Sequence, residues 1–425
     1  MARQELVVLD GSVIVGTLAR TADEITFRYD QAWQLRDKAT PLSVSLPLTV
    51  QLHADDVVTP WLWGLLPDNA RVLSRWGRTF HTTTKHPLGL LAAVGRDLPG
   101  RFTIVPAEQA HDAVPSGVEW LTDSDVAALL QEVRADQTAW LGSQGSGGRW
   151  SLAGAQAKIA LFSDGRRWGR PYGRSATTHI LKPAIGGLDD HDLNEHLCLQ
   201  AARGVGVVAV ASRLVTVGDE RAISVERYDR IIGPDQSVER VHQEDLCQAL
   251  TVHPEAKYEN EGGPSVSMIG SLLNRHVRGA PAEPTRVRFA EALALNWLLA
   301  GSDAHAKNYS LLLSGAQVRL APLYDVASAL PYRDFHAPKF TMAMKLGGTY
   351  LAGRVGATQW RKVAAQLLLD EDHMLDRIHQ LATDLPTAMA VAAKADPVQE
   401  LNSALPDRLT DLVATRCRVL RAHLD

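Results

Sequence analysis

One stretch near residue 300 constrains the fold more than any other part of the chain. The run ALALNWLLAG (292–301) is almost wholly apolar and ends at Gly301, the residue type that most often follows the end of a helix. The polar residues 302–308 come next, and YSLLLSGAQVRL (309–320) then has the pattern of a β-hairpin. We therefore expect a buried helix and a tight hairpin to hold the polar turn rigidly, as catalytic groups require.

The polar turn and the hairpin carry three residues in the spacing of a phosphoryl-transfer site. Asp303 is followed five positions later by Asn308, and Asp325 comes directly after the hairpin. In such sites one Asp accepts the proton of the attacking hydroxyl, while an Asn and a second Asp hold Mg²⁺, which prefers oxygen ligands. An alternative is a phosphoester hydrolase in which Asp303, His305 and Asp325 bind a metal ion.

A second segment favours the phosphoryl-transfer interpretation. The turn from Ser151 to Gln156 consists mostly of small residues and precedes a predicted strand, so its backbone amides could approach phosphate oxygens. Its sequence does not match the P-loop pattern. The strand THILKP (178–183) follows, and Lys182 at its end has the position of a lysine that contacts the α- and β-phosphates.

Three further residues have two interpretations each. Glu195, on the predicted helix after Lys182, either holds that lysine in place or forms a capping box with Asp192. Lys158 is either a second phosphate contact or a charge at a strand edge. Tyr228, in the segment VERYD, either covers an adenine ring or belongs to the core.

The pattern of the whole chain indicates several structural units. ELVVLDGSVIVGTL (5–18) predicts a hairpin across Asp10-Gly11 in a β-rich beginning. Residues 62–76 are predicted to be helical with an interruption at Pro67, and PLGLLAAVGRD (87–97) to form a second helix. The run GSQGSGGR (142–149) predicts a linker. Strands with one helix are expected after it, and helices, apart from the hairpin at 309–320, beyond about residue 240.

The final segment, 407–424, has the apolar stripe of a helix docked on a core. Its arginines, Arg416, Arg418 and Arg421, are expected on the solvated face.

Composition excludes several classes of protein. In 425 residues, 45% are hydrophobic and 22% charged, which is typical of soluble globular proteins. The 44 Lys and Arg against 48 Asp and Glu give a net charge of −4, so binding of nucleic acid through bulk charge is not expected. The three cysteines form no CxxC pair, and neither a signal peptide nor an apolar run of about 18 residues is present. We expect a cytoplasmic protein that does not enter a membrane.

With these residues in view, the chain closely resembles the HipA family of bacterial serine/threonine protein kinases, the toxins of type II toxin–antitoxin modules. The resemblance extends through about residue 347. The matching segments follow the family's order and are TFRYD (26–30), PLSVSLPL (41–48), LLPDN (65–69), AVGRDLPG (93–100), SLAGAQAK (151–158), THILKP (178–183), VERYDR (225–230), QEDLCQAL (243–250), KYENEGGP (257–264), GSDAHAKNYS (301–310) and APLYDVAS (321–328).

The resemblance implies an α+β fold, a HipA-like bilobal kinase that binds ATP between its lobes. The implied units are a β-rich N-terminal subdomain (1–110), a helical segment with the Gly/Ser linker (111–149), a mixed α/β nucleotide-binding lobe with the phosphate loop (150–235), and an all-α or mainly helical C-terminal lobe that carries the catalytic loop (236–425).

The resemblance also implies the role of each site residue. Asp303 would be the catalytic base, with Asn308 and Asp325 on Mg²⁺ and Ser151 as the site of autophosphorylation. The implied ATP contacts are Leu152, Ala153, Gly154, Ala155, Gln156, Lys158, Lys182, Glu226, Tyr228 and His305, with Glu195 and Lys307 in support. Many kinases have a lysine two residues after the catalytic Asp; here that position is His305 and the lysine is Lys307, so the role of that lysine stays unassigned.

The resemblance further implies the biological setting. It predicts a Mg²⁺- and ATP-dependent kinase that phosphorylates a cytoplasmic protein of translation, such as an aminoacyl-tRNA synthetase. The implied partners are a small helix-turn-helix antitoxin and, mainly through that antitoxin, operator DNA. Two alternatives stay open: a catalytically silent subunit of the antitoxin–operator complex, and the metal-dependent hydrolase.

Overall fold

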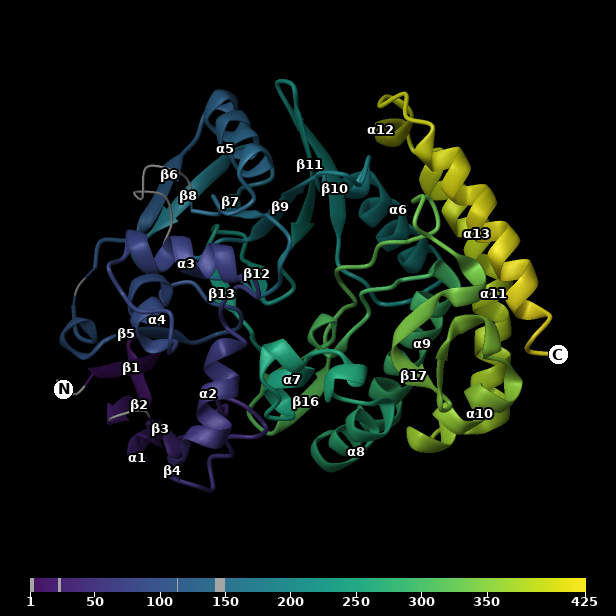
Figure 1. The fold of residues 1–425 in the computed structure, drawn as a ribbon. Coiled ribbons are helices and arrows are strands. Elements are labelled where there is room, and N and C mark those ends of the chain that lie inside the picture. The colour runs from purple at the N-terminus through teal and green to yellow at the C-terminus, as the bar shows by residue number, and fades with distance from the viewer. Residues whose placement is uncertain (1–3, 22–23, 113, 142–149) are drawn as a thin grey trace.

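Strands and helices are mixed in the first part of the chain, and helices predominate in the last part (Figure 1). The computed structural model describes residues 4–21, 24–112, 114–141 and 150–425. The predicted linker at 142–149 lies outside these ranges. The mixed α+β class predicted from the sequence is confirmed.

The N-terminal subdomain is a five-stranded antiparallel sheet packed against helices, with strand order β4-β3-β2-β1-β5. The predicted hairpin at Asp10-Gly11 is confirmed, and Gly11 has the positive φ of +61° that favours glycine in such a turn. The predicted interruption at Pro67 separates two helices. The elements are β1 (Gln4–Asp10), β2 (Val13–Thr21), β3 (Glu24–Tyr29), α1 (Gln31–Gln34), β4 (Leu52–His53), α2 (Asp55–Trp63), α3 (Ala70–Thr79), α4 (Leu88–Val94) and β5 (Thr103–Pro106).

A six-stranded antiparallel sheet forms the next unit, with strand order β10-β11-β9-β7-β8-β6. Sequence analysis missed β6 and β8, because GVEW and WGRPY contain glycine, proline or charged residues instead of an apolar run. Helix α5 packs on this sheet. The elements are β6 (Gly117–Trp120), α5 (Asp123–Ala135), β7 (Ile159–Ser163), β8 (Trp168–Tyr172), β9 (His179–Pro183), α6 (His191–Gly204), β10 (Ser212–Val217) and β11 (Glu220–Glu226).

The rest of the chain is mainly helical and also carries short strands. The hairpin predicted at 309–320 is confirmed as β15 and β16, and the unpredicted strand β14 extends it to three strands. The elements are β12 (Arg230–Ile232), β13 (Val238–Arg240), β14 (His242–Asp245), α7 (Leu246–Ala249), α8 (Val266–His276), α9 (Ala282–Leu299), β15 (Ser310–Ser314), β16 (Gln317–Leu320), β17 (Thr341–Leu346), β18 (Thr349–Leu351), α10 (Ala357–Gln366), α11 (Glu371–Ala393), α12 (Asp396–Gln399) and α13 (Leu405–Arg421).

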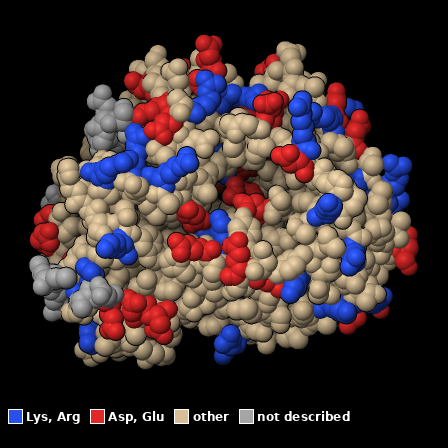
Figure 2. Space-filling view, viewed as in Figure 1, with Lys and Arg blue, Asp and Glu red and all other residues tan. Residues whose placement is uncertain are grey.

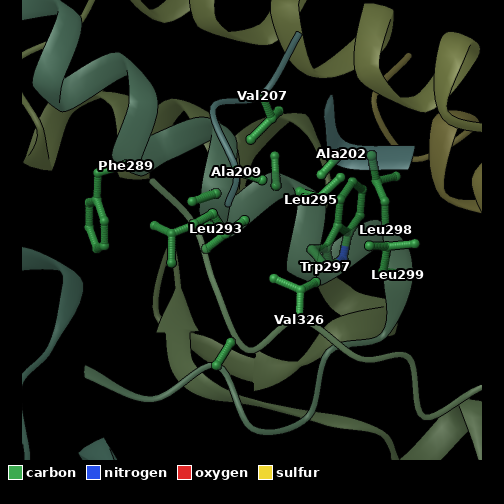
Figure 3. Close-up of a cluster of buried hydrophobic side chains, with 14 of the residues drawn as sticks. Ala202, Val207, Ala209, Phe289, Leu293, Leu295, Trp297, Leu298, Leu299 and Val326 are labelled. Atoms are coloured by element: carbon green, nitrogen blue, oxygen red, sulfur yellow. The ribbon is translucent and has the colours of Figure 1, made fainter. Parts of the chain in front are cut away.

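Helix α9 lies at the centre of the largest core. Every residue from Phe289 to Leu299 is buried, and Figure 3 shows Leu293, Leu295 and Trp297 among the side chains packed there. The Trp297 indole N–H donates to the carbonyl of Ala352 at 2.9 Å. The helix that carries the polar turn is therefore fixed on all sides, as predicted from its apolar sequence.

The last helix, α13, docks through its predicted apolar stripe, and one of its arginines differs from the prediction. Arg418 and Arg421 are exposed, whereas Arg416 is half-buried and donates from Nε and Nη2 to the carbonyl of Trp297 at 3.1 and 2.8 Å. This carbonyl lies in the last turn of α9, where it also accepts from the Ala300 backbone N–H at 3.4 Å. Within the described ranges, no helix combines the length and apolarity needed to cross a membrane.

Candidate functional site

A buried lysine joins two parts of the chain that lie far apart in sequence. The ammonium of Lys182, on β9, is 2.7 Å from Glu195 Oε1 on α6 and 2.7 Å from Asp325 Oδ1. Burial would lower the pKa of Lys182, but Asp325 and Glu195 outweigh it and raise this pKa. The lysine is therefore a permanent cation at the place predicted for a phosphate contact.

The structure decides between the two interpretations of Glu195. Helix α6 begins at His191 with Asp190 as its N-cap residue, so Asp192 lies inside the helix and the predicted Asp192–Glu195 capping box does not form. Instead, Glu195 is 1% exposed and pairs with Lys182. Burial raises the pKa of Glu195, while Lys182 opposes that rise.

The predicted catalytic turn, residues 302–308, begins where α9 ends. Ala300 adopts the left-handed conformation, with φ +55°, that the sequence led us to expect of Gly301. Gly301 is needed for space instead, because a Cβ atom there would lie 2.2 Å from Asn296 Oδ1. Asn308 braces the turn across its width: its Nδ2 donates to the carbonyl of Asp303 at 2.6 Å. The side-chain oxygen of Asn308 is left to serve as a ligand.

Asp303 presents its carboxylate to solvent at the mouth of the site. Its side chain is 63% exposed, and the Tyr258 hydroxyl donates to its Oδ1. His305 Nε2 lies 3.7 Å from the same oxygen, and burial lowers the pKa of His305, so the imidazole is neutral at pH 7. A carboxylate with this access can accept a proton from an incoming hydroxyl.

Lys307 is held away from the mouth of the site. Its ammonium is 2.8 Å from Asp245 Oδ2 and 3.6 Å from Asp68 Oδ1, and its side chain is 2% exposed. The structure therefore gives Lys307 two carboxylate partners within the protein.

The predicted phosphate loop, the turn from Ser151 to Gln156, lies against the first subdomain. Gly154 has a φ of +100°, which a residue with a side chain rarely adopts. Lys158 Nζ donates to the carbonyl of Ala153 at 2.7 Å, and burial together with the charge of Lys182 lowers the pKa of Lys158 to about 8. The buried Nε2 of Gln156 has no hydrogen-bond partner. Ser151 is fully buried and donates from Oγ to the carbonyl of Leu65 at 2.7 Å.

The two predicted adenine contacts lie at the end of β11 and just beyond it. Glu226 is exposed, and its backbone N–H donates to the carbonyl of Ala211 at 3.0 Å, so this N–H is already used. Tyr228 donates from its hydroxyl to Gln243 Oε1 at 2.6 Å and stacks on Tyr324 with ring centroids 5.5 Å apart.

These residues surround one cavity of about 990 Å³. Figure 2 shows a hollow on this face with acidic side chains gathered around it. Of the predicted site residues, Ser151 alone does not contribute to the lining. Those that line the cavity are Leu152, Ala153, Gly154, Ala155, Gln156, Lys158, Lys182, Glu195, Glu226, Tyr228, Asp303, His305, Lys307, Asn308 and Asp325.

Sequence reasoning assigned no role to several residues that the structure places in the site. Asp68, Asp245, Lys257 and Tyr258 all line or border the cavity and contact the catalytic turn directly or through one partner. They belong to the segments LLPDN, QEDLCQAL and KYENEGGP. These segments carried the family resemblance, but the sequence alone did not indicate what the four residues contact.

The oxygen donors in the cavity fit a magnesium ion whose other ligands would be nucleotide phosphates and water. Asn308 and Asp325 supply oxygen donors, and Mg²⁺ is commonly bound by one or two such side chains together with phosphates and water. Burial would raise the pKa of Asp325, but Lys182 and Lys158 outweigh it and lower this pKa, so the group is ionised. In the described ranges, no three His, Cys, Asp or Glu side chains are grouped as a metal site. Asp303, His305 and Asp325 thus do not form the triad that the hydrolase alternative requires.

Comparisons with known proteins agree over the whole chain. The HipA N-terminal domain family matches residues 6–105, and the HipA-like C-terminal domain family matches residues 150–389. A putative kinase of Sinorhizobium fredii, Y4mE, is 32% identical over 418 residues, which cover 98% of each chain. The serine/threonine-protein kinase toxin HipA of Shewanella oneidensis is 26% identical over 431 residues, 98% of this chain and 95% of that protein.

The fold is also shared with a solved structure. A chain in the complex of HipA, HipB and operator DNA from Shewanella oneidensis matches with a TM-score of 0.83 at 24% identity. The match covers 97% of this chain and 96% of that one.

Proposed function

The chain belongs to the HipA family of serine/threonine kinase toxins, and we propose that it transfers the γ-phosphoryl group of Mg-ATP to a protein serine or threonine. The observation that carries the proposal is the Lys182–Glu195–Asp325 cluster, in which the phosphate lysine of one lobe meets the metal-binding Asp of the other. ATP lies between the lobe at 150–235 and the lobe at 236–425.

Each step of the reaction has a residue that fits it. The backbone amides of residues 152–156 and the Lys182 ammonium hold the phosphates. Asn308 and Asp325 would hold a magnesium ion, which when bound would supply positive charge to the polyphosphate. The substrate hydroxyl displaces Tyr258 from Asp303 and gives its proton to that carboxylate. The new P–O bond forms as the bond to the ADP oxygen breaks.

We also propose that Ser151 is the site of autophosphorylation. Its hydroxyl is fully buried and bonded to Leu65, so the loop must leave the cleft before Ser151 can receive a phosphate. A dianionic phosphate would not fit back into this dry position, and it would compete with ATP for the loop amides. Autophosphorylation therefore switches the kinase off.

The proposed partners follow from the family. The solved relative is described as a complex with HipB and operator DNA, which supports a small helix-turn-helix antitoxin for this chain, with DNA contacted mainly through it. The proposed substrate is a cytoplasmic protein of translation, such as an aminoacyl-tRNA synthetase.

The test is incorporation of label from [γ-³²P]ATP with Mg²⁺ into a cell lysate and into the protein itself. We expect wild type to label Ser151 and at least one lysate protein, and Asp303→Asn to label neither. Overexpressed wild type should arrest growth, whereas Asp303→Ala should not. Equal arrest by both would indicate the catalytically silent subunit. Folded wild type without any label would refute the proposal.

A further inference from the structure

A turn of the N-terminal subdomain reaches into the cleft and holds the phosphate loop. Residues 65–69 make three hydrogen bonds to that loop. Leu65 accepts from Ser151 Oγ at 2.7 Å, the Asp68 backbone N–H donates to the carbonyl of Gly154 at 3.0 Å, and Asn69 Nδ2 donates to the carbonyl of Ala155 at 3.4 Å. The turn lies more than 80 positions earlier in the chain, so these contacts are purely tertiary.

The same turn also reaches the other lobe. The Asp68 carboxylate is 3.3 Å from Lys257 Nζ and 3.6 Å from Lys307 Nζ. Lys307 lies inside the catalytic turn, between His305 and Asn308. Burial would raise the pKa of Asp68, but Lys307 and Lys257 outweigh it and lower this pKa, so Asp68 is an anion between two cations.

We propose that residues 65–69 are a positioning element of the kinase site, which sets the phosphate loop and the catalytic turn in register with each other. The element acts on one side through the backbone of the phosphate loop and on the other through the Asp68 carboxylate. This inference rests on the proposed kinase function, and it assigns a catalytic purpose to the N-terminal subdomain, which carries none of the groups proposed to touch ATP.

The two loops need a shared contact because neither is fixed relative to the other by its own lobe. The phosphate loop is built mostly from small residues and has a left-handed glycine, so apart from Ser151 and Leu152 its own side chains do little to fix it. The catalytic turn is braced from α9 and from the hairpin, but those elements belong to the other lobe. Transfer requires the γ-phosphate and Asp303 to meet within about an ångström of the productive geometry, and a contact shared by both loops supplies that alignment.

Two nearly isosteric variants separate the two halves of the element. Asp68→Asn keeps the backbone bond to Gly154 and removes the charge that faces the catalytic turn. Asn69→Asp keeps the oxygen that caps α3, which accepts from the N–H groups of Arg71 and Val72, and removes the donor to Ala155. Asp10→Asn is the control, because it breaks the ion pair with Arg101 in the same subdomain, outside the cleft.

Steady-state phosphorylation gives the first readout. We expect Asp68→Asn to lower kcat at least about tenfold with the ATP KM changed less than about threefold, because misplacement by an ångström costs up to about a hundredfold in rate. Asn69→Asp should raise the ATP KM several-fold and leave kcat nearly unchanged. Asp10→Asn should alter neither. A wild-type kcat for Asp68→Asn, or the same combined loss in all three variants, would overturn the proposal.

Amide hydrogen exchange gives a readout that does not depend on activity. Exchange should quicken at 302–309 in Asp68→Asn and at 152–157 in Asn69→Asp, with Asp10→Asn like wild type. If both variants exchange like wild type, the element does not position the loops. An inactive wild type with this exchange pattern would instead refute the kinase proposal and leave the mechanical inference standing.

Discussion

Removing the Lys182 ammonium should destabilise the protein by an amount that depends on pH. The change is Lys182→Met, which keeps most of the buried volume and strands two carboxylates. Asp325 is 34% exposed at its side chain and can regain water, but Glu195 is 1% exposed and its Oε2 already lacks a hydrogen-bond partner. Removing one partner of a buried ion pair costs about 3–5 kcal/mol, and here that cost falls mainly on Glu195.

The pH dependence follows from the direction of the Glu195 pKa. Burial raises this pKa in the folded protein, and Lys182 is the largest opposing influence, so its removal raises the pKa further. At pH values above the pKa that Glu195 has in the unfolded chain, the folded variant then binds more protons than the unfolded variant. Its free energy of unfolding therefore falls as pH rises. The deficit relative to wild type should therefore be small near pH 5 and reach about 3–5 kcal/mol near pH 8.

Thermal unfolding at pH 5.5 and pH 8, compared at each pH with wild type, measures the effect. For a folding unit of 150–250 residues, this loss corresponds to a fall in Tm of roughly 10 °C at pH 8. The double variant Lys182→Met/Glu195→Gln removes the stranded charge and should recover most of that loss. A deficit that is equal at both pH values, or one that the second substitution leaves unchanged, would refute the reasoning.

Two further predictions concern buried arginine contacts. Asp97→Asn should lower the free energy of unfolding by about 3–5 kcal/mol in a urea titration, because the fully buried carboxylate faces Arg230 at 2.9 Å and Arg240 at 3.3 Å; a loss below about 1 kcal/mol would contradict this account. Arg416→Met should cost about 1–3 kcal/mol in the same assay by removing the two guanidinium hydrogen bonds to the Trp297 carbonyl, without a change in the ATP KM. A changed KM would indicate that α13 influences the site itself.

The spacing of residues along the sequence correctly predicted the part of the site that is built from consecutive elements. The helix, turn and hairpin around Asp303 are consecutive in sequence, and their periodicity and glycines determine where the polar turn falls. The strand that ends near Lys182 was predicted for the same reason. By contrast, β14 was missed because its four residues, HQED, have no apolar pattern, and the strand forms by pairing with β15.

Residue spacing could not predict contacts between side chains from distant segments of the chain. Glu195 satisfied two local patterns equally well, and only the approach of Lys182 and the true start of α6 separate them. Asp68 and Tyr258 lie 235 and 45 positions from Asp303, and no periodicity links them. Both residues do lie in segments that resemble the HipA family. Their chemical roles could be proposed only after the structure showed their contacts.

The lysine of the catalytic turn shows why residue type and position are not enough to assign a role. Lys307 is a cation two residues from the position at which many kinases carry one, which favours a phosphate contact. Its ammonium is instead shared by Asp245 and Asp68, and releasing it would leave the buried Asp245 carboxylate without its cation and Asp68 with Lys257 alone. His305, at the expected position, is neutral at pH 7. In the proposed mechanism, the positive charge near the transferred phosphate would therefore come from Lys182, Lys158 and bound magnesium, while Lys307 would hold the turn in shape.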